Sequence, residues 1–165
     1  MRSCHFLFPI TCYMLIKGGK VLIRNIREAT KEDIQSLCYL IKELNGSEIS
    51  YSVMENRLKF IEDSPFDFLY VYEEIDSILG MLGFRIRENI EDLNRFGEIS
   101  IISVDSNARR KGVGRSLMGF AEDLANKYQC VGTWLVSGMG RKDEAHRFYK
   151  DLGYEITGYR FVKRF

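Results

Sequence analysis

The stretch between residues 97 and 136 constrains the fold most, because its apolar pattern changes period twice. Gly97–Val104 is rich in β-branched residues, which is typical of a strand. The apolar residues that follow recur at helical spacing and predict a long amphipathic helix: Val113, Leu117, Ala121, Leu124 and Tyr128. Thr133–Val136 then predicts a short buried strand. Two strands joined by such a helix lie parallel in one sheet, with a right-handed crossover.

The rest of the chain surrounds this unit with antiparallel strands and further helices. Thr30, with an acidic residue three positions later, predicts a helix start, and Asn45-Gly46 predicts its end. We expect strands at Val21–Arg27, Phe66–Glu73, Ser77–Arg87 and, as one or two closing strands, Tyr154–Phe165. We expect helices at Ile34–Leu44, Val53–Ile61 and Asp143–Leu152. The prediction is one mixed α/β domain with a central twisted sheet of six to seven strands and about four flanking helices.

Charge and cysteine content exclude several classes of function. The 165 residues carry 24 Lys and Arg against 23 Asp and Glu, so the net charge is +1 and no basic excess indicates a nucleic-acid partner. The four cysteines form no C-x-x-C pair, and only two histidines accompany them, so we expect no metal site. Reduced thiols in a chain with ample core material predict a cytoplasmic location.

The first twenty residues differ in character from the rest. Residues 3–16 are apolar but too short to span a bilayer, and they lack a typical cleavage site before Lys17. We hypothesise that the functional chain begins near Val21 and that residues 1–20 are a non-native or disordered extension; a signal peptide is the alternative. The domain is therefore expected to cover residues 21–165.

The loop between the predicted strand and the long helix has the composition of an anion site. Gly112 and Gly114 stand where the helix begins, and glycine lets the backbone approach a ligand closely. Free N–H groups at a helix N-terminus bind phosphate, and four basic residues surround the same point: Arg109, Arg110, Lys111 and Arg115. A Walker A loop and a dinucleotide fingerprint both need other residues at Arg115 and Leu117. A solvated basic turn is the alternative interpretation.

Two motifs in the expected order resemble those of one enzyme family. Arg-x-x-Gly-x-Gly at Arg109–Gly114 resembles the acyl-CoA pyrophosphate loop of the GNAT superfamily of N-acetyltransferases. Glu144–Tyr154 resembles that superfamily's later motif, an Ala-x-x-Phe-Tyr helix that ends in Leu-Gly-Tyr. The similarity spans Val21–Phe165 and implies a single GNAT-like domain, in which the fourth and fifth strands splay apart to receive the thioester. It also implies acetyl-CoA as co-substrate.

The resemblance implies roles for individual residues. Tyr149 matches the tyrosine that protonates the leaving thiolate, and Glu98 matches a glutamate that is the general base in several members. The implied contacts with the cofactor come from backbone groups, first along the strand and then around the loop: Ile102, Ser103, Val104, Arg109, Arg110, Lys111, Gly112, Val113, Gly114, Arg115 and Ser116.

Each catalytic assignment has a structural alternative. Strand alternation predicts that Glu98 shares a face with Ser100, Ile102 and Val104, opposite Ile99 and Ile101, and this face could simply be polar and exposed. Tyr149 could instead be a core tyrosine, and we expect Trp134 to be a core residue of a buried strand.

The acceptor is expected to be the primary amine of a small molecule. The segment Arg141–Phe165 is most similar to aminoalkylphosphonate N-acetyltransferases, whereas the segment Arg87–Phe96 is acidic and lacks their histidine-rich character. Aminoglycoside and protein-lysine acetylation are alternatives, as is a non-catalytic module that senses acyl-CoA. The acceptor site is expected around Asn45–Ser52 and Arg87–Phe96. The family also implies dimerisation through C-terminal strands, for which the aromatic edge Tyr159–Phe165 is suited.

Overall fold

The computed structural model describes residues 13–17, 20–138 and 142–165. Its strands are β1 (Tyr13–Lys17), β2 (Lys20–Glu28), β3 (Asp67–Glu74), β4 (Ser77–Glu88), β5 (Arg95–Val104) and β6 (Thr133–Leu135). Its helices are α1 (Ile34–Asn45), α2 (Tyr51–Asp63), α3 (Val113–Lys127) and α4 (Arg147–Asp151), the last preceded by a π-helical turn at Lys142–His146. In the described part of the chain, no helix is both long and apolar enough to cross a bilayer.

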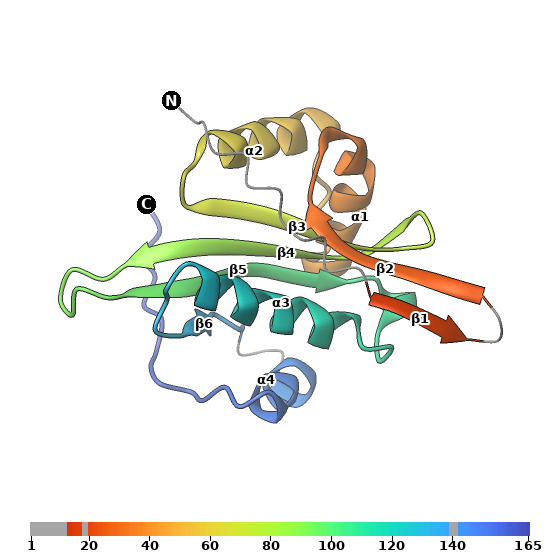
Figure 1. Ribbon diagram of the computed structural model, residues 1–165. Helices are drawn as coiled ribbons and strands as arrows, with labels where there is room; N and C mark the ends of the chain where they lie inside the picture. Colours follow the sequence, from red (N-terminus) through yellow and green to blue (C-terminus); the bar gives the residue numbers. More distant parts are fainter. Residues whose placement is uncertain (1–12, 18–19, 139–141) are drawn as a thin grey trace.

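The strands form one sheet in the order β1-β2-β3-β4-β5-β6. Every neighbouring pair is antiparallel except β5 and β6, which are parallel and are joined through α3. This confirms the strand–helix–strand unit that the sequence predicts. Figure 1 shows α1 and α2 on one side of the sheet and α3 and α4 on the other.

The sheet carries a separate hydrophobic core on each face. Alternate residues of β3 and β4 pack against α3, and their sequence neighbours pack against α1 and α2. Tyr70 and Leu82 belong to the α3 side, whereas Val71 and Met81 belong to the α1/α2 side. A sheet that is covered on both faces explains why β3 and β4 have runs of consecutive buried residues instead of a simple alternation.

The closing strands predicted over Tyr154–Phe165 are wrong. The described chain has no strand there, and the large apolar side chains of the segment, such as Tyr159 and Phe161, are exposed. A strand needs a hydrogen-bonding partner, and β6, at the edge of the sheet, is only 3 residues long. From Val21 onward the sheet therefore has five strands, β2–β6, instead of six or seven. The further strand, β1, lies ahead of the predicted domain start.

An ion cluster fixes the start of α1 to the sheet. Arg27 of β2 donates through both terminal nitrogens to the Asp33 carboxylate, at 2.7 and 2.9 Å, and through Nε to Glu73 of β3 at 3.0 Å. Asp33 also accepts the Thr30 N–H at 2.8 Å, which confirms the predicted helix start. Burial alone would raise the pKa of Asp33, but the hydrogen bonds from Arg27 and Thr30 outweigh it and lower the pKa.

Replacing Asp33 by Asn should destabilise the fold by about 2 kcal/mol at neutral pH, because Arg27 loses the more buried of its two carboxylate partners. A lowered carboxyl pKa contributes stability above the unfolded value of about 3.9 and loses it as the pH falls through the folded value. The difference between Asp33→Asn and the parent should therefore shrink below about pH 4 in urea titrations. Glu48→Gln, which removes the exposed pair with Lys42, is the control and should leave the midpoint unchanged. A constant difference down to pH 2 would contradict this account.

Candidate active site

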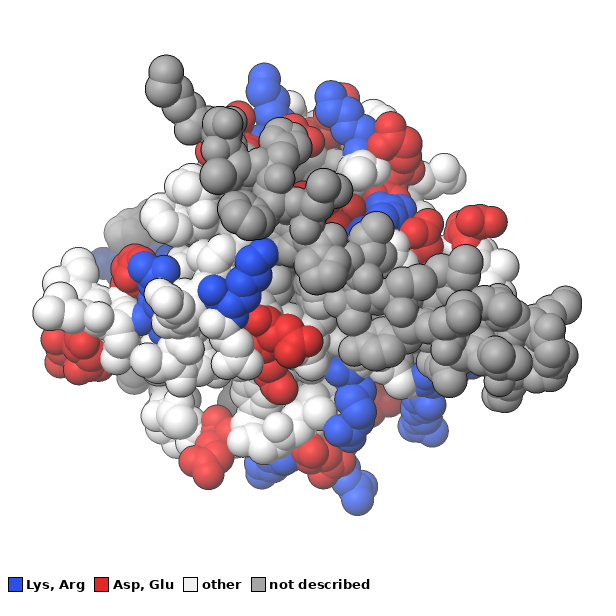
Figure 2. Space-filling model, viewed as in Figure 1, with Lys and Arg blue, Asp and Glu red and all other residues white. Residues whose placement is uncertain are grey.

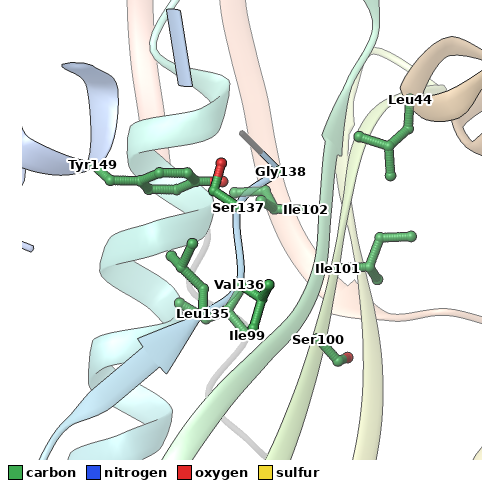
Figure 3. A pocket seen from close by; sticks show the side chains of 10 residues that line it. All are labelled: Leu44, Ile99, Ser100, Ile101, Ile102, Leu135, Val136, Ser137, Gly138 and Tyr149. Atoms are coloured by element: carbon green, nitrogen blue, oxygen red, sulfur yellow. The ribbon is translucent and has the colours of Figure 1, made fainter. Parts of the chain in front are cut away.

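A cavity opens where β5 and β6 separate. The two strands pair only from Gly97–Thr133 to Ile99–Leu135, after which β6 ends and β5 continues to Val104. The cavity, of about 220 Å³, is lined by residues of both strands and of two helices: Leu44, Ile99, Ser100, Ile101, Ile102, Leu135, Val136, Ser137, Gly138 and Tyr149. Figure 3 shows Tyr149 of α4 on one side of it and Leu44 of α1 on the other. The space thus lies between the helices of the two opposite faces.

A β-bulge at Ser100 shapes the wall of this cavity. Gly83 of β4 pairs with Ile101 and Phe84 pairs with Ile99, so Ser100 is an extra residue in β5. Gly83 is required opposite the bulge, because a Cβ there would lie 2.6 Å from the Ser100 Oγ and 2.7 Å from the Ile101 Cγ2. The bulge therefore depends on both strands: β5 supplies the extra residue, and Gly83 of β4 leaves room for it.

The bulge overturns the predicted alternation along β5. Ile99 and Ile102 both pack on the α3 side, whereas Ile101 packs on the α1/α2 side. The extra residue shifts the pleat by one position, so Glu98 lies on the same face as Ile101 and opposite Ile102 and Val104. The prediction that Glu98 shares a face with Ile102 and Val104 is wrong for this reason.

Glu98 lies just outside the cavity, next to Ile99, which lines it. Its side chain is 15% exposed, and its Oε2 accepts a hydrogen bond from the Nε of Arg87, whose side chain is 49% exposed. Arg85, directly opposite Glu98 in the sheet, instead forms an ion pair with Asp67 of β3. Glu98 is thus a largely buried carboxylate held by one guanidinium, rather than an exposed residue of a polar face.

Trp134 does not belong to the core, contrary to the prediction. Its neighbour Leu135 packs on the α3 side, so Trp134 points to the α1/α2 face, where 37% of it is exposed. It pairs in register with Glu98. The sequence pattern missed this because β6 lies at the edge of the sheet, and an edge strand can leave one face open.

Tyr149 is the tyrosine that reaches the cavity. It follows the π-helical turn and contacts the Phe148 ring edge-to-face at 5.3 Å. It packs with Leu135 on the α3 side, the face opposite Trp134. Tyr154 is nearby, but its hydroxyl is hydrogen-bonded to Thr133, and burial is the main cause of its raised pKa. Of these two tyrosines, only Tyr149 lines the cavity.

The N-terminus of α3 has the backbone geometry that the glycine motif predicts. Gly112 precedes the helix at φ +90°, in open space, a conformation that a residue with a Cβ adopts only with strain. The first helical hydrogen bond runs from the Ser116 N–H to the Gly112 carbonyl, so the N–H groups of Val113, Gly114 and Arg115 lie before it. A phosphate fits such a helix end.

The basic residues of this loop are exposed. Arg110 makes only a long contact of 3.8 Å with Glu144, and both side chains are exposed. Arg109, Lys111 and Arg115 are also exposed. Figure 2 shows Lys and Arg mixed with Asp and Glu over the viewed face, without one continuous basic surface. Positive charge is therefore concentrated locally in this loop, where it suits a small anion.

The strand residues ahead of the loop offer backbone groups rather than side chains. The side chains of Ile102 and Val104 pack against the α3 core, and the hydroxyl of Ser103 is buried and donates to the Leu40 carbonyl at 2.8 Å. Val113, at the start of α3, is also buried. The side chains of Ser103 and Val113 are thus occupied in the fold, whereas Ile102 also lines the cavity. Within the described residues, no three His, Cys, Asp or Glu side chains form a metal-binding group.

Known proteins share both this architecture and this sequence pattern. Residues 28–154 match the acetyltransferase (GNAT) family. The chain belongs to the GNAT family. Aminoalkylphosphonate N-acetyltransferase of Salmonella typhimurium is 29% identical to it over 84% of this chain and 89% of its own. As a member, the protein is an acetyl-CoA-dependent N-acetyltransferase.

Solved GNAT structures have the same fold. Glucosamine-6-phosphate N-acetyltransferase from Arabidopsis thaliana has a TM-score of 0.72 at 21% identity, over 86% of this chain and 98% of its own. An aminoglycoside N-acetyltransferase, AAC(6')-Iy in complex with CoA, has a TM-score of 0.74 at 15% identity, over 86% of this chain and 93% of its own. At this identity the likeness shows the shared fold alone.

Sequence reasoning missed several cavity residues. Ser137 and Gly138 follow β6 and line the cavity together with Tyr149, and Leu44 enters from the end of α1. The run Ser137-Gly138, directly after a short strand, is a signal for an open backbone. Nothing in the periodicity of α1 could have shown that Leu44 leaves the core for the cavity.

Gly83→Ala should destabilise the GNAT domain by about 1–3 kcal/mol, because the added methyl overlaps the β-branched Ile101. Acetyl transfer should fall further than stability alone explains, since the bulge forms the cavity wall. Gly119→Ala, in the interior of α3 with nothing within 4 Å of its Cβ position, is the matched control. That change should stabilise the fold by about 0.5–1 kcal/mol. Equal effects of both substitutions in denaturant melts would contradict the assignment.

Proposed function

We propose that the enzyme transfers the acetyl group of acetyl-CoA to the primary amine of a small molecule by direct attack, with Glu98 as general base and Tyr149 as general acid. One observation carries the proposal: the required groups occur in sequence along β5. Glu98 comes first, then the cavity residues Ile99–Ile102, and then Val104 with the anion-binding loop. At about 3.3 Å per residue, Glu98 lies about 20 Å from the end of the strand.

The cofactor would lie along the strand toward the loop. Its pyrophosphate would accept hydrogen bonds from the backbone N–H groups of Val113, Gly114 and Arg115, with Ser116 at the same helix end and the basic side chains of Arg109–Lys111 nearby. The pantetheine amides would pair with the backbone of Ile102–Val104, which has no strand partner on the β6 side beyond Ile99. This places the thioester at the cavity.

Glu98 would remove the proton from the incoming ammonium. An alkylammonium has a pKa near 10 and must lose its proton before its nitrogen can attack. The bond from Arg87 fixes the direction of the carboxylate, which lies beside the cavity and on its acceptor face. Proton transfer through one water is compatible with the position of Glu98 just outside the cavity lining.

Tyr149 would donate a proton to the departing CoA thiolate. When the N–C bond forms and the C–S bond breaks, the CoA sulfur leaves as a thiolate, which needs a donor. Tyr149 packs on the α3 side and lines the cavity there, whereas Glu98 lies on the α1/α2 side, so acid and base would act from opposite sides of the reacting carbonyl. Such acid–base assistance is typically worth about 10²–10⁴-fold in rate.

The acceptor that we favour is a small molecule with an amino group, in line with the named activity of the Salmonella relative. The loop after β4 contains the exposed acids Glu91 and Asp92, which could attract a polycationic sugar, so an aminoglycoside is the second candidate. We also propose that the enzyme is cytoplasmic, because its free thiols at Cys38 and Cys130 are typical of a reducing compartment. A homodimer through Tyr159–Phe165 would cover the exposed aromatic side chains of that segment.

Acetyl-CoA should stabilise the full chain by about 2.7 kcal/mol at 100 times its dissociation constant, which raises the melting temperature by roughly 5–10 °C. NAD at the same concentration should not. Thiol release with a panel of 2-aminoethylphosphonate, kanamycin and a lysine peptide then identifies the acceptor class. The absence of stabilisation by saturating acetyl-CoA would remove the cofactor assignment. Stabilisation with no turnover of any amine would favour the acyl-CoA-sensing module.

Glu98→Gln should lower kcat about 10²–10⁴-fold at pH 7, with activity recovering as the pH approaches the amine pKa of about 10.

Tyr149→Phe should lower kcat about 10²-fold or more with little change in the KM for acetyl-CoA, because it affects only the departure of the thiolate. Tyr154→Phe is the control for the tyrosine, since that hydroxyl bonds Thr133. If Tyr154→Phe impairs kcat as much as Tyr149→Phe, the acid role of Tyr149 fails.

A further inference from the structure

Four residues form a straight row across the sheet, beginning at β3 and ending at β6. The strand registers pair Asp67 with Arg85, Arg85 with Glu98, and Glu98 with Trp134. Alternation places all four on the α1/α2 face, because their strand neighbours Phe68, Phe84, Ile99 and Leu135 pack on the α3 side. Directly paired side chains on one face of a sheet are close enough to interact. Glu98 therefore has a guanidinium on one side and an indole on the other.

The two sides of Glu98 are not equivalent. On the β4 side, Arg85 is paired with Asp67 and Arg87 holds the Glu98 carboxylate. A second cation would meet two guanidinium groups there. On the β6 side Trp134 carries no charge and is 37% exposed. A positively charged amine is thus repelled from one side of the base and admitted at the other.

We propose that Trp134 forms one wall of the acceptor subsite and binds the ammonium group of the substrate against its indole face beside Glu98. The ligand class is an organic primary ammonium. Indole is the side chain that best attracts a cation over its ring, and a neighbouring carboxylate adds charge complementarity. The inference rests on the proposed role of Glu98 and adds the side from which the amine approaches.

The subsite leads directly into the cavity. The cavity also opens to the α1/α2 side, because Ile101, which packs on that side, and Leu44 of α1 line it. Trp134 and Glu98 lie on the same side, next in sequence to the lining residues Leu135 and Ile99. One or two residues along a strand correspond to about 3–7 Å. An amine that gives its proton to Glu98 becomes neutral, loses its attraction to the indole and is already beside the space where the thioester would lie. Binding of the cation and release of the nucleophile are therefore coupled to the same proton.

Trp134 is the single tryptophan of the chain, so its emission reports on this subsite directly. We expect 2-aminoethylphosphonate to change the emission, whereas ethylphosphonate, which lacks the amine, should not. Kanamycin and a lysine peptide extend the test to other ammonium compounds. Emission that no amine of this panel alters would overturn the proposal, as would a response to CoA alone that equals the response to the amine.

Substitutions of Trp134 then test whether its side chain binds the cation through its aromatic face or only provides an apolar surface. Trp134→Phe retains an aromatic face and should raise the acceptor KM less than Trp134→Leu, for which we expect a rise of roughly 3–30-fold. The KM for acetyl-CoA should not change. Equal acceptor KM values in the parent and Trp134→Leu, with normal turnover, would overturn the subsite and leave the acetyltransferase assignment intact. An emission response without turnover would support the subsite while the role of Glu98 as base fails.

Discussion

The separation of β5 from β6 is the constraint on which the rest of the structure depends. Side chains of both strands pack in the core on the α3 side, which holds the strands together. They separate because β6 ends after 3 residues while β5 continues. The backbone of β5 beyond Ile99 is thereby left without its parallel partner. Buried backbone N–H and C=O groups need partners, and an amide-rich ligand arm can supply them. The cavity thus lies where the pairing of the two strands is incomplete.

The bulge at Ser100 links this separation to chemistry. One extra residue moves Ile101 to the α1/α2 face, while Ile102 returns to the α3 core. Without the extra residue, regular alternation would place Ile102 and Val104 on the same face as Glu98 instead of against the α3 core. Gly83 makes the bulge possible, since any side chain at that position would occupy the space of Ser100 and Ile101. A glycine in one strand therefore controls the geometry of the active site in the next.

The elements were predictable from sequence because they depend on local periodicity and capping. The Thr30 start, the Gly46 end at φ +77° and the glycine loop ahead of α3 are local signals, and the structure contains each of them. The exposure of Trp134 and the lack of a strand in Tyr154–Phe165 were not predictable, because both depend on which strand forms the edge of the sheet. Alternation cannot reveal a bulge, since the residue that breaks the period, Ser100, is an ordinary polar residue.

The distribution of charge around Glu98 follows from the same antiparallel register. Arg85 lies directly opposite Glu98, but its ion pair is with Asp67, whose Oδ2 also accepts a hydrogen bond from Ser64 just after α2. Arg85 therefore ties the end of α2 to the sheet, and the more exposed Arg87 is the residue that holds Glu98. A base with one partner keeps an oxygen available for a proton, whereas a base enclosed by two guanidinium groups would be a purely structural ion. The pairing of Arg85 with Asp67 thus leaves Glu98 with Arg87 as its guanidinium partner, as the proposed role of a base requires.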